Sequence, residues 1–266
     1  MSYSCRDICK MIDLYAPPEL AMEGDPIGLH LGNPEKEVSR LFLALELNPA
    51  VVNEALAYGA DMIVVHHTPF FAPVTQLRDD DRGNTVLLEL IRNNVALFTA
   101  HTNLDAVAGG VSDVLAEILE LDEAIVLQPI GKTVVTAGLG RIGSLRAPVT
   151  LEAYVGFISQ KLGVDGVRYV GEKSRQIGTV ACCGGSGAFL VKTAAERGAD
   201  LLVTSDVKHH DAALAESLGL ALVDAGHFAT EAPMVRRLES YLIENTMGLS
   251  IAVSTIYADP FTYIKS

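Results

Sequence analysis

Residues 55–65 read ALAYGADMIVV, and residues 194–204 read AAERGADLLVT. Each stretch combines the end of an amphipathic helix, a glycine at the place of a helix C-cap, and a short apolar run with the length of a buried strand. Apolar strands that alternate with amphipathic helices are typical of sheets that are covered by helices. The two stretches therefore predict an α/β fold that contains a repeated helix–strand unit.

The repeat extends beyond these two stretches. Residues 96–101, ALFTAH, parallel residues 221–227, ALVDAGH, with one additional residue in the second copy. In each copy the final histidine precedes a carboxylate by four positions. We therefore predict two similar α/β halves related by an internal duplication, which can pack as one domain. The predicted boundaries are 1–125 for the first half, 126–175 for an inserted or connecting segment, and 176–266 for the second half.

The pattern of apolar residues also predicts the individual elements. Strands are expected at 41–45, 62–65, 95–99, 134–139, 178–182, 201–204, 220–223 and 249–254. Helices are expected at 4–16, with Ser4 as N-cap, and at 49–58, 85–93, 111–120, 151–162, 187–197, 210–218 and 231–245. Residues 138–143 satisfy the pattern GxGxxG. The stretch that follows is extended and contains a proline, where a dinucleotide site needs a helix, so we predict a glycine-rich strand there.

The composition excludes several classes of protein. The chain of 266 residues has a formal net charge of −13, and an acidic chain repels phosphate backbones, which makes nucleic acid an unlikely partner. Charged residues near the N-terminus argue against a signal peptide, and no apolar run is long enough to span a bilayer. We expect a soluble, cytoplasmic protein. Its cysteines fit no zinc-ribbon or redox spacing and are expected to be buried free thiols: Cys5, Cys9, Cys182 and Cys183.

The seven histidines point to chemistry at the ends of strands. His66 and His67 follow the apolar run 62–65, and neighbouring residues of an extended chain point in opposite directions. The pair therefore suits two different metal ions, or one ion and one supporting contact, better than chelation of a single ion. The alternative is a structural pair hydrogen-bonded to the backbone.

Two carboxylates accompany a histidine at a spacing of four residues, which places both side chains on one side of a helical turn. Glu231 follows His227 in this way, in a segment where Glu231 is expected to begin a helix, and Asp105 follows His101. A carboxylate can bridge two cations and offset their repulsion. The structural alternatives are a helix N-terminal acid for Glu231 and a turn residue for Asp105.

These five residues predict a catalytic metal site. Three imidazoles and two carboxylates shared by two divalent ions leave open coordination positions for water or substrate. Nitrogen and oxygen ligands without a thiolate suit Zn, Mn, Fe or Ni. The predicted metal ligands are His66, His67, Asp105, His227 and Glu231.

Other polar residues are predicted to support this site. His101 is a candidate acid/base or a partner of a metal-bound carboxylate. Asp206, His209 and His210 are candidates for residues that contact the metal ligands without binding the metal themselves. Each of these four residues has a structural role as its alternative. The glycine-rich turn that contains Gly185, Ser186 and Gly187 is a candidate anion site, the alternative being a tight turn that needs small residues.

The motifs as a set resemble the NIF-three-like dinuclear metal-centre family, whose members are often named GTP cyclohydrolase I type 2 homologues. The resemblance is carried by HHTPFF at 66–71, HTNLD at 101–105, GGSG at 184–187, TSDVKHHD at 204–211 and DAGHFATE at 224–231. It implies the same five metal ligands, two similar α/β halves, and a toroidal homohexamer whose metal sites face an inner cavity. Two departures concern the pocket around the ligands: residues 24–27 replace the usual Trp-Asp-Asn motif, and Thr68 stands between the histidine pair and Pro69.

The resulting functional hypothesis is a hydrolase that uses two divalent metal ions and a metal-bound hydroxide. The resemblance implies a GTP cyclohydrolase-like reaction, in which the imidazole ring of GTP opens and formate is released. Its substrate would be a nucleotide or another small anion. The alternatives are a non-enzymatic hexameric protein that binds metal or a partner, and a metal-dependent phosphodiesterase or amidohydrolase.

Overall fold

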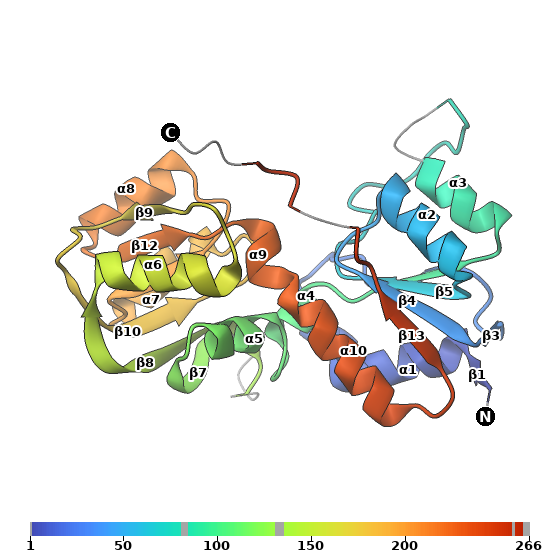
Figure 1. Ribbon diagram of the computed structural model, residues 1–266, viewed down its shortest axis with the longest axis horizontal. Coiled ribbons are helices and arrows are strands. Elements are labelled where there is room, and N and C mark those ends of the chain that lie inside the picture. Colours follow the sequence, from blue (N-terminus) through green and yellow to red (C-terminus); the bar gives the residue numbers. More distant parts are fainter. Residues whose placement is uncertain (1, 81–84, 131–135, 257–258, 263–266) are drawn as a thin grey trace. The chain divides into compact units, whose positions relative to one another are not determined.

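The structure is a computed structural model that describes residues 2–80, 85–130, 136–256 and 259–262 (Figure 1). The chain forms two compact units, each with its own sheet. Unit 1 consists of Met1–Leu104 and Val235–Ala258, and unit 2 of Asp105–Met234 and Asp259–Ser266. The chain passes from one unit to the other at 104/105, 234/235 and 258/259, whereas the boundaries predicted from the sequence are 125/126 and 175/176.

Unit 1 is built on a five-stranded sheet in which four strands are parallel. An antiparallel strand completes one edge. The order is β13 (Ser250–Val253), β4 (Arg40–Ala44), β5 (Met62–Val65), β6 (Ala96–Thr99) and β2 (Gly28–Leu31). A short ladder joins β1 (Tyr3–Ser4) to β3 (Glu37–Val38), and η1 (Pro18–Leu20) is a 3₁₀ turn.

Helices cover both faces of this sheet (Figure 1). On one face, α2 (Pro49–Tyr58) and α3 (Thr85–Arg92) pack on strand residues that include Phe42, Ile63 and Leu97. On the other face lie α1 (Cys5–Tyr15) and α10 (Pro233–Asn245), joined by a bond from the Tyr241 hydroxyl to the Met11 carbonyl. Because both faces are covered, the central strands are almost entirely apolar, which is why they could be predicted from the sequence.

Unit 2 is built on a six-stranded mixed sheet. The order is β7 (Asp122–Pro129), β8 (Gly138–Thr150), β10 (Gln176–Cys182), β11 (Leu201–Thr204), β12 (Ala221–Asp224) and β9 (Arg168–Val170). Within the described part of unit 2, the strands β10, β11 and β12 pair in parallel and the other pairs are antiparallel. The segment 126–175 is therefore part of this sheet, since it supplies β8, β9 and the end of β7.

Two groups of helices cover the unit 2 sheet. One core contains α5 (Val111–Ile118) and α6 (Leu151–Leu162). The other contains η2 (Ala188–Leu190), α7 (Val191–Glu196) and α8 (His209–Ser217). Two five-residue helices, α4 (Thr102–Ala106) and α9 (His227–Glu231), carry residues of interest for the metal site. Among the described residues, no helix combines the length and the apolar character that crossing a membrane requires.

The α/β fold class is confirmed, and most elements lie within one or two residues of their expected bounds. Ser4 caps α1 as predicted. Both repeat stretches form a helix, a left-handed glycine and a strand, with φ of +75° at Gly59 and +77° at Gly198, while a duplication of the halves stays a prediction. The helix expected at 187–197 is divided into η2 and α7, and part of the strand expected at 134–139 lies outside the described residues. Glu231 ends a helix instead of beginning one.

The cysteines are free thiols as expected, but Cys9 is only partly buried. All four thiols are free, and three of them are buried: Cys5, Cys182 and Cys183. Burial raises the pKa of Cys9 and of Cys182 to about 12, so these thiols stay protonated at neutral pH. The GxGxxG run is the first part of the strand β8, which confirms the interpretation as a glycine-rich strand.

Candidate metal centre

Three histidines of unit 1 meet at the C-terminal ends of two strands of its sheet. His66 and His67 follow β5, and His101 follows β6, two residues after the end of that strand. Because β5 and β6 are adjacent and parallel, their C-terminal ends lie on the same side of the sheet. One ring nitrogen from each of the three residues lies within 4.8 Å of the others, a spacing that can hold a metal ion.

The backbone determines how His66 is presented. Its amide donates to the carbonyl of Leu45 at 3.0 Å, and its Nδ1 donates to the carbonyl of Ala100 at 2.9 Å. A proton on Nδ1 makes Nε2 the ligating nitrogen, which is how metal-binding histidines are usually oriented. His66 therefore has the tautomer that a divalent cation requires.

His101 is held by the carboxylate of Asp25. Its Nδ1 donates to Oδ1 of Asp25 at 2.9 Å, and Asp25 also accepts bonds from the amide and the hydroxyl of Thr102. Burial would raise the pKa of Asp25, but the bonds from Thr102 and His101 outweigh it and lower this pKa. Burial, together with the nearby His66, lowers the pKa of His101. His101 is thus a neutral imidazole at neutral pH, able to bind a metal or to accept a proton.

Two further side chains border the unit 1 histidines. Nδ1 of His67 lies 3.5 Å from Oε2 of Glu46, just beyond β4. The ring of Phe71, which is mostly exposed, stands edge-on to His101 with 5.7 Å between the ring centres. Glu46 and Asp25 thus contact candidate site histidines, and neither was predicted from the sequence. Asp25 stands within the segment that replaces the family's Trp-Asp-Asn motif, and this position in the sequence could have identified it as a candidate.

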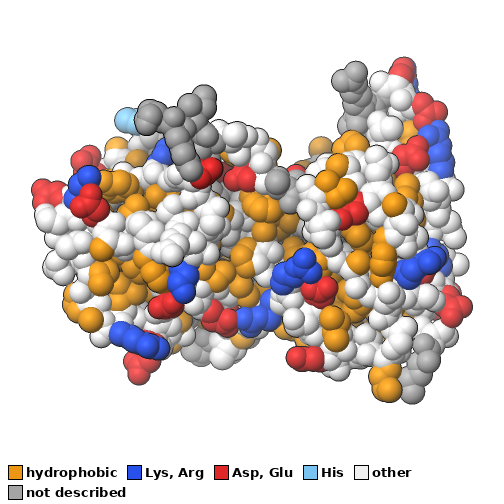
Figure 2. Space-filling view, in the orientation of Figure 1, with side chains coloured by type: hydrophobic (Ala, Val, Ile, Leu, Met, Phe, Trp, Pro, Cys, Tyr) orange, Lys and Arg blue, Asp and Glu red, His pale blue; other side chains and the backbone are white. Residues whose placement is uncertain are grey.

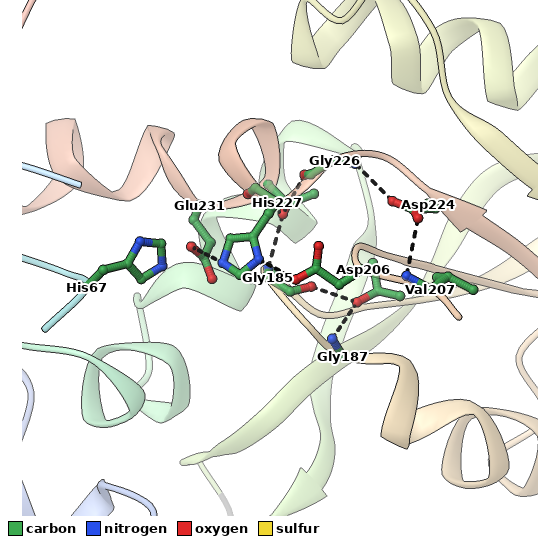
Figure 3. Close-up of polar contacts among 12 residues, drawn as sticks. His67, Gly185, Gly187, Asp206, Val207, Asp224, Gly226, His227 and Glu231 are labelled. Atoms are coloured by element: carbon green, nitrogen blue, oxygen red, sulfur yellow. Dashed lines mark hydrogen bonds and ion pairs between the residues drawn. The ribbon is translucent and has the colours of Figure 1, made fainter. Parts of the chain in front are cut away.

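In unit 2, His227 lies between two carboxylates (Figure 3). Gly226, with φ of +88°, leads into α9, whose first residue is His227 and whose last is Glu231. The His227 Nε2 lies 3.0 Å from Oε2 of Glu231, and its Nδ1 lies 2.7 Å from Oδ2 of Asp206. The four-residue spacing thus brings this histidine and carboxylate together, as the sequence predicted.

The charges around His227 fit a cation. Burial would lower the pKa of His227, but hydrogen bonds and ion pairs with Glu231 and Asp206 outweigh it and raise this pKa to about 9. Without a metal, the proton on Nε2 carries the positive charge that the carboxylates attract. A divalent ion can replace that proton, since metal binding to histidine releases it. The donor set of imidazole and carboxylate therefore fits a divalent metal.

Glycine is required next to Glu231. Gly185 has φ of +62°, and a Cβ atom on it would lie 2.0 Å from Oε1 of Glu231. A methyl group at Gly187 would likewise lie 2.5 Å from the hydroxyl of Thr204. These contacts support the interpretation of the run as a tight turn of small residues.

The amide groups of this turn have internal partners. Gly185 donates to the hydroxyl of Thr230 at 3.0 Å, and Gly187 donates to the hydroxyl of Thr204 at 2.9 Å. Anion binding at Gly185, Ser186 and Gly187 stays a prediction.

The remaining predicted residues lie in unit 2. Asp105, in α4, and Glu231 both have charges that add to the effect of burial in raising the pKa of Cys183. His209 and His210 begin α8 and are exposed, with their ring centres 5.4 Å apart. Neither belongs to a metal-compatible group among the described residues.

The surface around these units carries charges of both signs. On the face drawn in Figure 2, Lys and Arg side chains are scattered among Asp and Glu and form no extended basic patch. That distribution agrees with the net charge of −13.

Comparisons with known proteins agree with the motifs. The model of the Duf34/NIF3 (NGG1p interacting factor 3) family matches residues 3–260. A protein of Clostridium acetobutylicum named GTP cyclohydrolase 1 type 2 homolog is 31% identical, over 99% of this chain and 100% of that one. A protein of Clostridium perfringens with the same name is 33% identical, over 97% and 98%.

Solved structures show the same fold. A Bacillus cereus protein related to NIF3 superposes with a TM-score of 0.92 at 26% identity, covering 98% of this chain and 99% of that one. The Staphylococcus aureus protein SA1388 superposes with a TM-score of 0.91 at 29% identity, with the same coverage.

Proposed function

This chain belongs to the Duf34/NIF3 family, and from that premise we propose that it is a hydrolase dependent on two divalent metal ions. The proposed ligands are His66 and His67 of unit 1 and Asp105, His227 and Glu231 of unit 2. Zn, Mn, Fe and Ni all suit this set of nitrogen and oxygen donors. The observation that carries the proposal is the position of His227, whose two ring nitrogens contact Glu231 and Asp206.

These donors would hold two divalent ions, and such ions would supply a nucleophile at neutral pH by lowering the pKa of water to about 7. The protein's own residues orient the ligands and move protons. Asp206 holds the ring of His227, and the Ala100 carbonyl holds the ring of His66. His101 is neutral and fixed by Asp25, so it is the proposed proton acceptor or donor during the reaction.

The proposed reaction is the opening of the imidazole ring of GTP with release of formate. The names of the Clostridium relatives support a guanine nucleotide as the substrate. We further propose that the protein works in the cytoplasm as a homohexamer, which light scattering coupled to gel filtration would test.

The metal proposal is tested by comparing two glutamate variants. Glu231→Gln keeps the size of a ligand and removes its charge, while Glu216→Gln makes the same change on the exposed side of α8. We expect the native chain and Glu216→Gln to contain about two ions, as in dinuclear hydrolases, and Glu231→Gln to lose metal while keeping its circular dichroism spectrum. Metal content by mass spectrometry that is the same in all three proteins would refute this ligand set.

The reaction itself is tested on the metal-loaded protein. Incubation with GTP should release formate, detected with formate dehydrogenase, and Glu231→Gln should release none. Metal binding without formate release would retain the metal centre and reject this substrate.

A further inference from the structure

A cavity of about 270 Å³ lies in unit 2, outside the proposed ligand set. It is bordered by the edge strand β9, the end of β12 and the start of α8. Its lining includes Arg168, Tyr169, Lys208, His209, Leu222 and Asp224. The cavity has the volume of about nine waters of liquid, since each occupies about 30 Å³. It is therefore large enough for a small organic molecule, and it has both apolar and charged walls.

Basic side chains gather around this cavity in a chain that is acidic overall. Three of the lining residues, Arg168, Lys208 and His209, are basic, whereas the whole chain has a formal charge of −13. Lys208 and His209 are exposed, so a ligand can reach them. A local cluster of this kind attracts an anion that the rest of the surface repels.

The carboxylate in the cavity offsets the charge of Arg168 and leaves the side chains of Lys208 and His209 unpaired with it. Asp224 is paired with the guanidinium of Arg168. It also accepts bonds from the amides of Val207, at 3.2 Å, and Gly226, at 3.3 Å. Asp224 therefore holds Arg168 and the two loops in place, and Lys208 and His209 remain to contact a ligand.

The same contacts connect the cavity with the metal ligand of unit 2 (Figure 3). Gly226, which donates to Asp224, immediately precedes His227, while Val207 follows the Asp206 that contacts the ring of His227. The cavity wall and the proposed metal ligand thus share two short loops. A molecule bound in the cavity would lie on the loops that carry this part of the site.

We propose that this cavity binds the phosphate group of a phosphorylated small molecule, with Lys208 and His209 as the contacts to its oxygens. An ammonium group forms charge-assisted hydrogen bonds with phosphate, and an imidazole N–H donates to its oxygens. Tyr169, which is partly exposed, then borders the organic part of the molecule. The binding of phosphate in this cavity is independent of the proposed function. The further step, that the phosphate belongs to the substrate of the metal centre, rests on the proposed function.

Calorimetric titration of the metal-loaded protein with GMP and with inorganic phosphate tests this site. Lys208→Gln removes one contact, and Lys192→Gln is the matched control, because Lys192 is an exposed lysine of α7 outside the cavity. We expect Lys208→Gln to bind GMP about tenfold more weakly than the native chain, which corresponds to one charge-assisted contact, and Lys192→Gln to bind it unchanged. Equal affinities in all three proteins, or no binding by the native chain, would overturn the proposal.

The ligand series separates the two sources of phosphate. Tighter binding of GMP than of inorganic phosphate, with both weakened by Lys208→Gln, indicates a phosphorylated organic molecule. Weakening of phosphate binding alone indicates a site for the free ion and overturns the assignment to an ester.

The Glu231→Gln variant separates this proposal from the metal centre. If that variant loses metal but still binds GMP in a Lys208-dependent manner, both proposals hold. If it keeps its metal and GMP binding still depends on Lys208, the ligand set fails and the cavity stands. If GMP binding disappears together with the metal and Lys208→Gln has no effect, the phosphate binds the metals and the cavity proposal is overturned.

Discussion

The Nδ1 atom of His227 lies 2.7 Å from Oδ2 of Asp206, a residue whose backbone is in the left-handed region with φ of +54°. Non-glycine residues in this conformation are uncommon and concentrate at functional sites. Asp206 ends the turn after β11 in a position from which its carboxylate fixes the ring of His227. The strained backbone and the contact to His227 thus belong to one local arrangement.

Replacing Asp206 by Asn should weaken metal binding without removing a ligand. The hydrogen bond from Nδ1 sets the tautomer and basicity of His227, and loss of such a partner typically costs about ten- to a hundredfold in metal affinity. Competition for zinc with a chromophoric chelator measures this change. Asp80→Asn, on an exposed aspartate of unit 1, is the control and should leave the affinity unchanged. An Asp206→Asn protein with native affinity would remove Asp206 from the site.

Replacing Gly185 by Ala should distort Glu231. The new methyl group would lie 2.0 Å from Oε1 of that residue, so the carboxylate has to move. The control is Gly198→Ala, because Gly198 has a similar φ of +77° and open space around the new atom. Gly198→Ala should cost about 1–2 kcal/mol of unfolding free energy, the price of the left-handed backbone alone. Gly185→Ala should cost about 1–3 kcal/mol more and should also lower metal content.

Urea unfolding and metal analysis of both variants check this prediction. If the two alanine variants unfold at the same urea concentration and retain equal metal, the contact between Gly185 and Glu231 has no consequence.

The sequence predicted the elements that are determined locally. The runs 62–65 and 201–203 are apolar throughout because helices cover both faces of each sheet, and a glycine marks the end of the helix before each run. The histidines after 62–65 and the pair His227 and Glu231 could also be predicted, because the strand or helix that carries them determines their positions.

Features that depend on distant residues could not be predicted in this way. Asp25 lies 76 positions before His101, and no spacing rule connects them. The helix expected at 187–197 begins as a 3₁₀ turn, because Gly187 is held by Thr204 on another strand. The strand β8 runs to Thr150, past Pro148, because its pairing with β10 continues there with a register shift.

The buried ion pair of unit 2 should be important for stability. The side chain of Arg141 is 2% exposed, and its guanidinium makes two bonds of 2.6 Å to the carboxylate of Asp113. It also donates to the carbonyls of Gly138, Gly140 and Val107. Asp113→Asn leaves a buried charge without its counter-ion, so we expect a loss of about 3–5 kcal/mol in unfolding free energy.

The control for this pair is Asp122→Asn, which breaks an ion pair between Asp122 and the exposed Arg146 in the same unit. Exposed pairs contribute about 1 kcal/mol or less, so this variant should unfold close to the native chain. Equal unfolding midpoints for the two asparagine variants in guanidinium chloride would contradict the importance of the buried pair.

The pH dependence of unit 1 should include a contribution from Glu54. Burial would raise the pKa of this carboxylate, but bonds from Ser254 and Thr255 outweigh it and lower the pKa below its ordinary value of 4.5. A carboxylate with a lowered pKa binds fewer protons in the folded state than in the unfolded state. Its contribution is therefore complete above pH 4.5 and is lost as the pH falls through the folded-state pKa.

Glu54→Gln should remove this part of the pH dependence. The difference in unfolding free energy between the native chain and Glu54→Gln should be largest near neutral pH and should shrink as the pH falls below 4.5. Urea titrations at a series of pH values measure the difference, and Glu216→Gln provides the control for a loss of charge at an exposed position. A difference that stays constant, or that grows as the solution becomes more acidic, would show that the bonds from Ser254 and Thr255 do not favour the ionised form of Glu54.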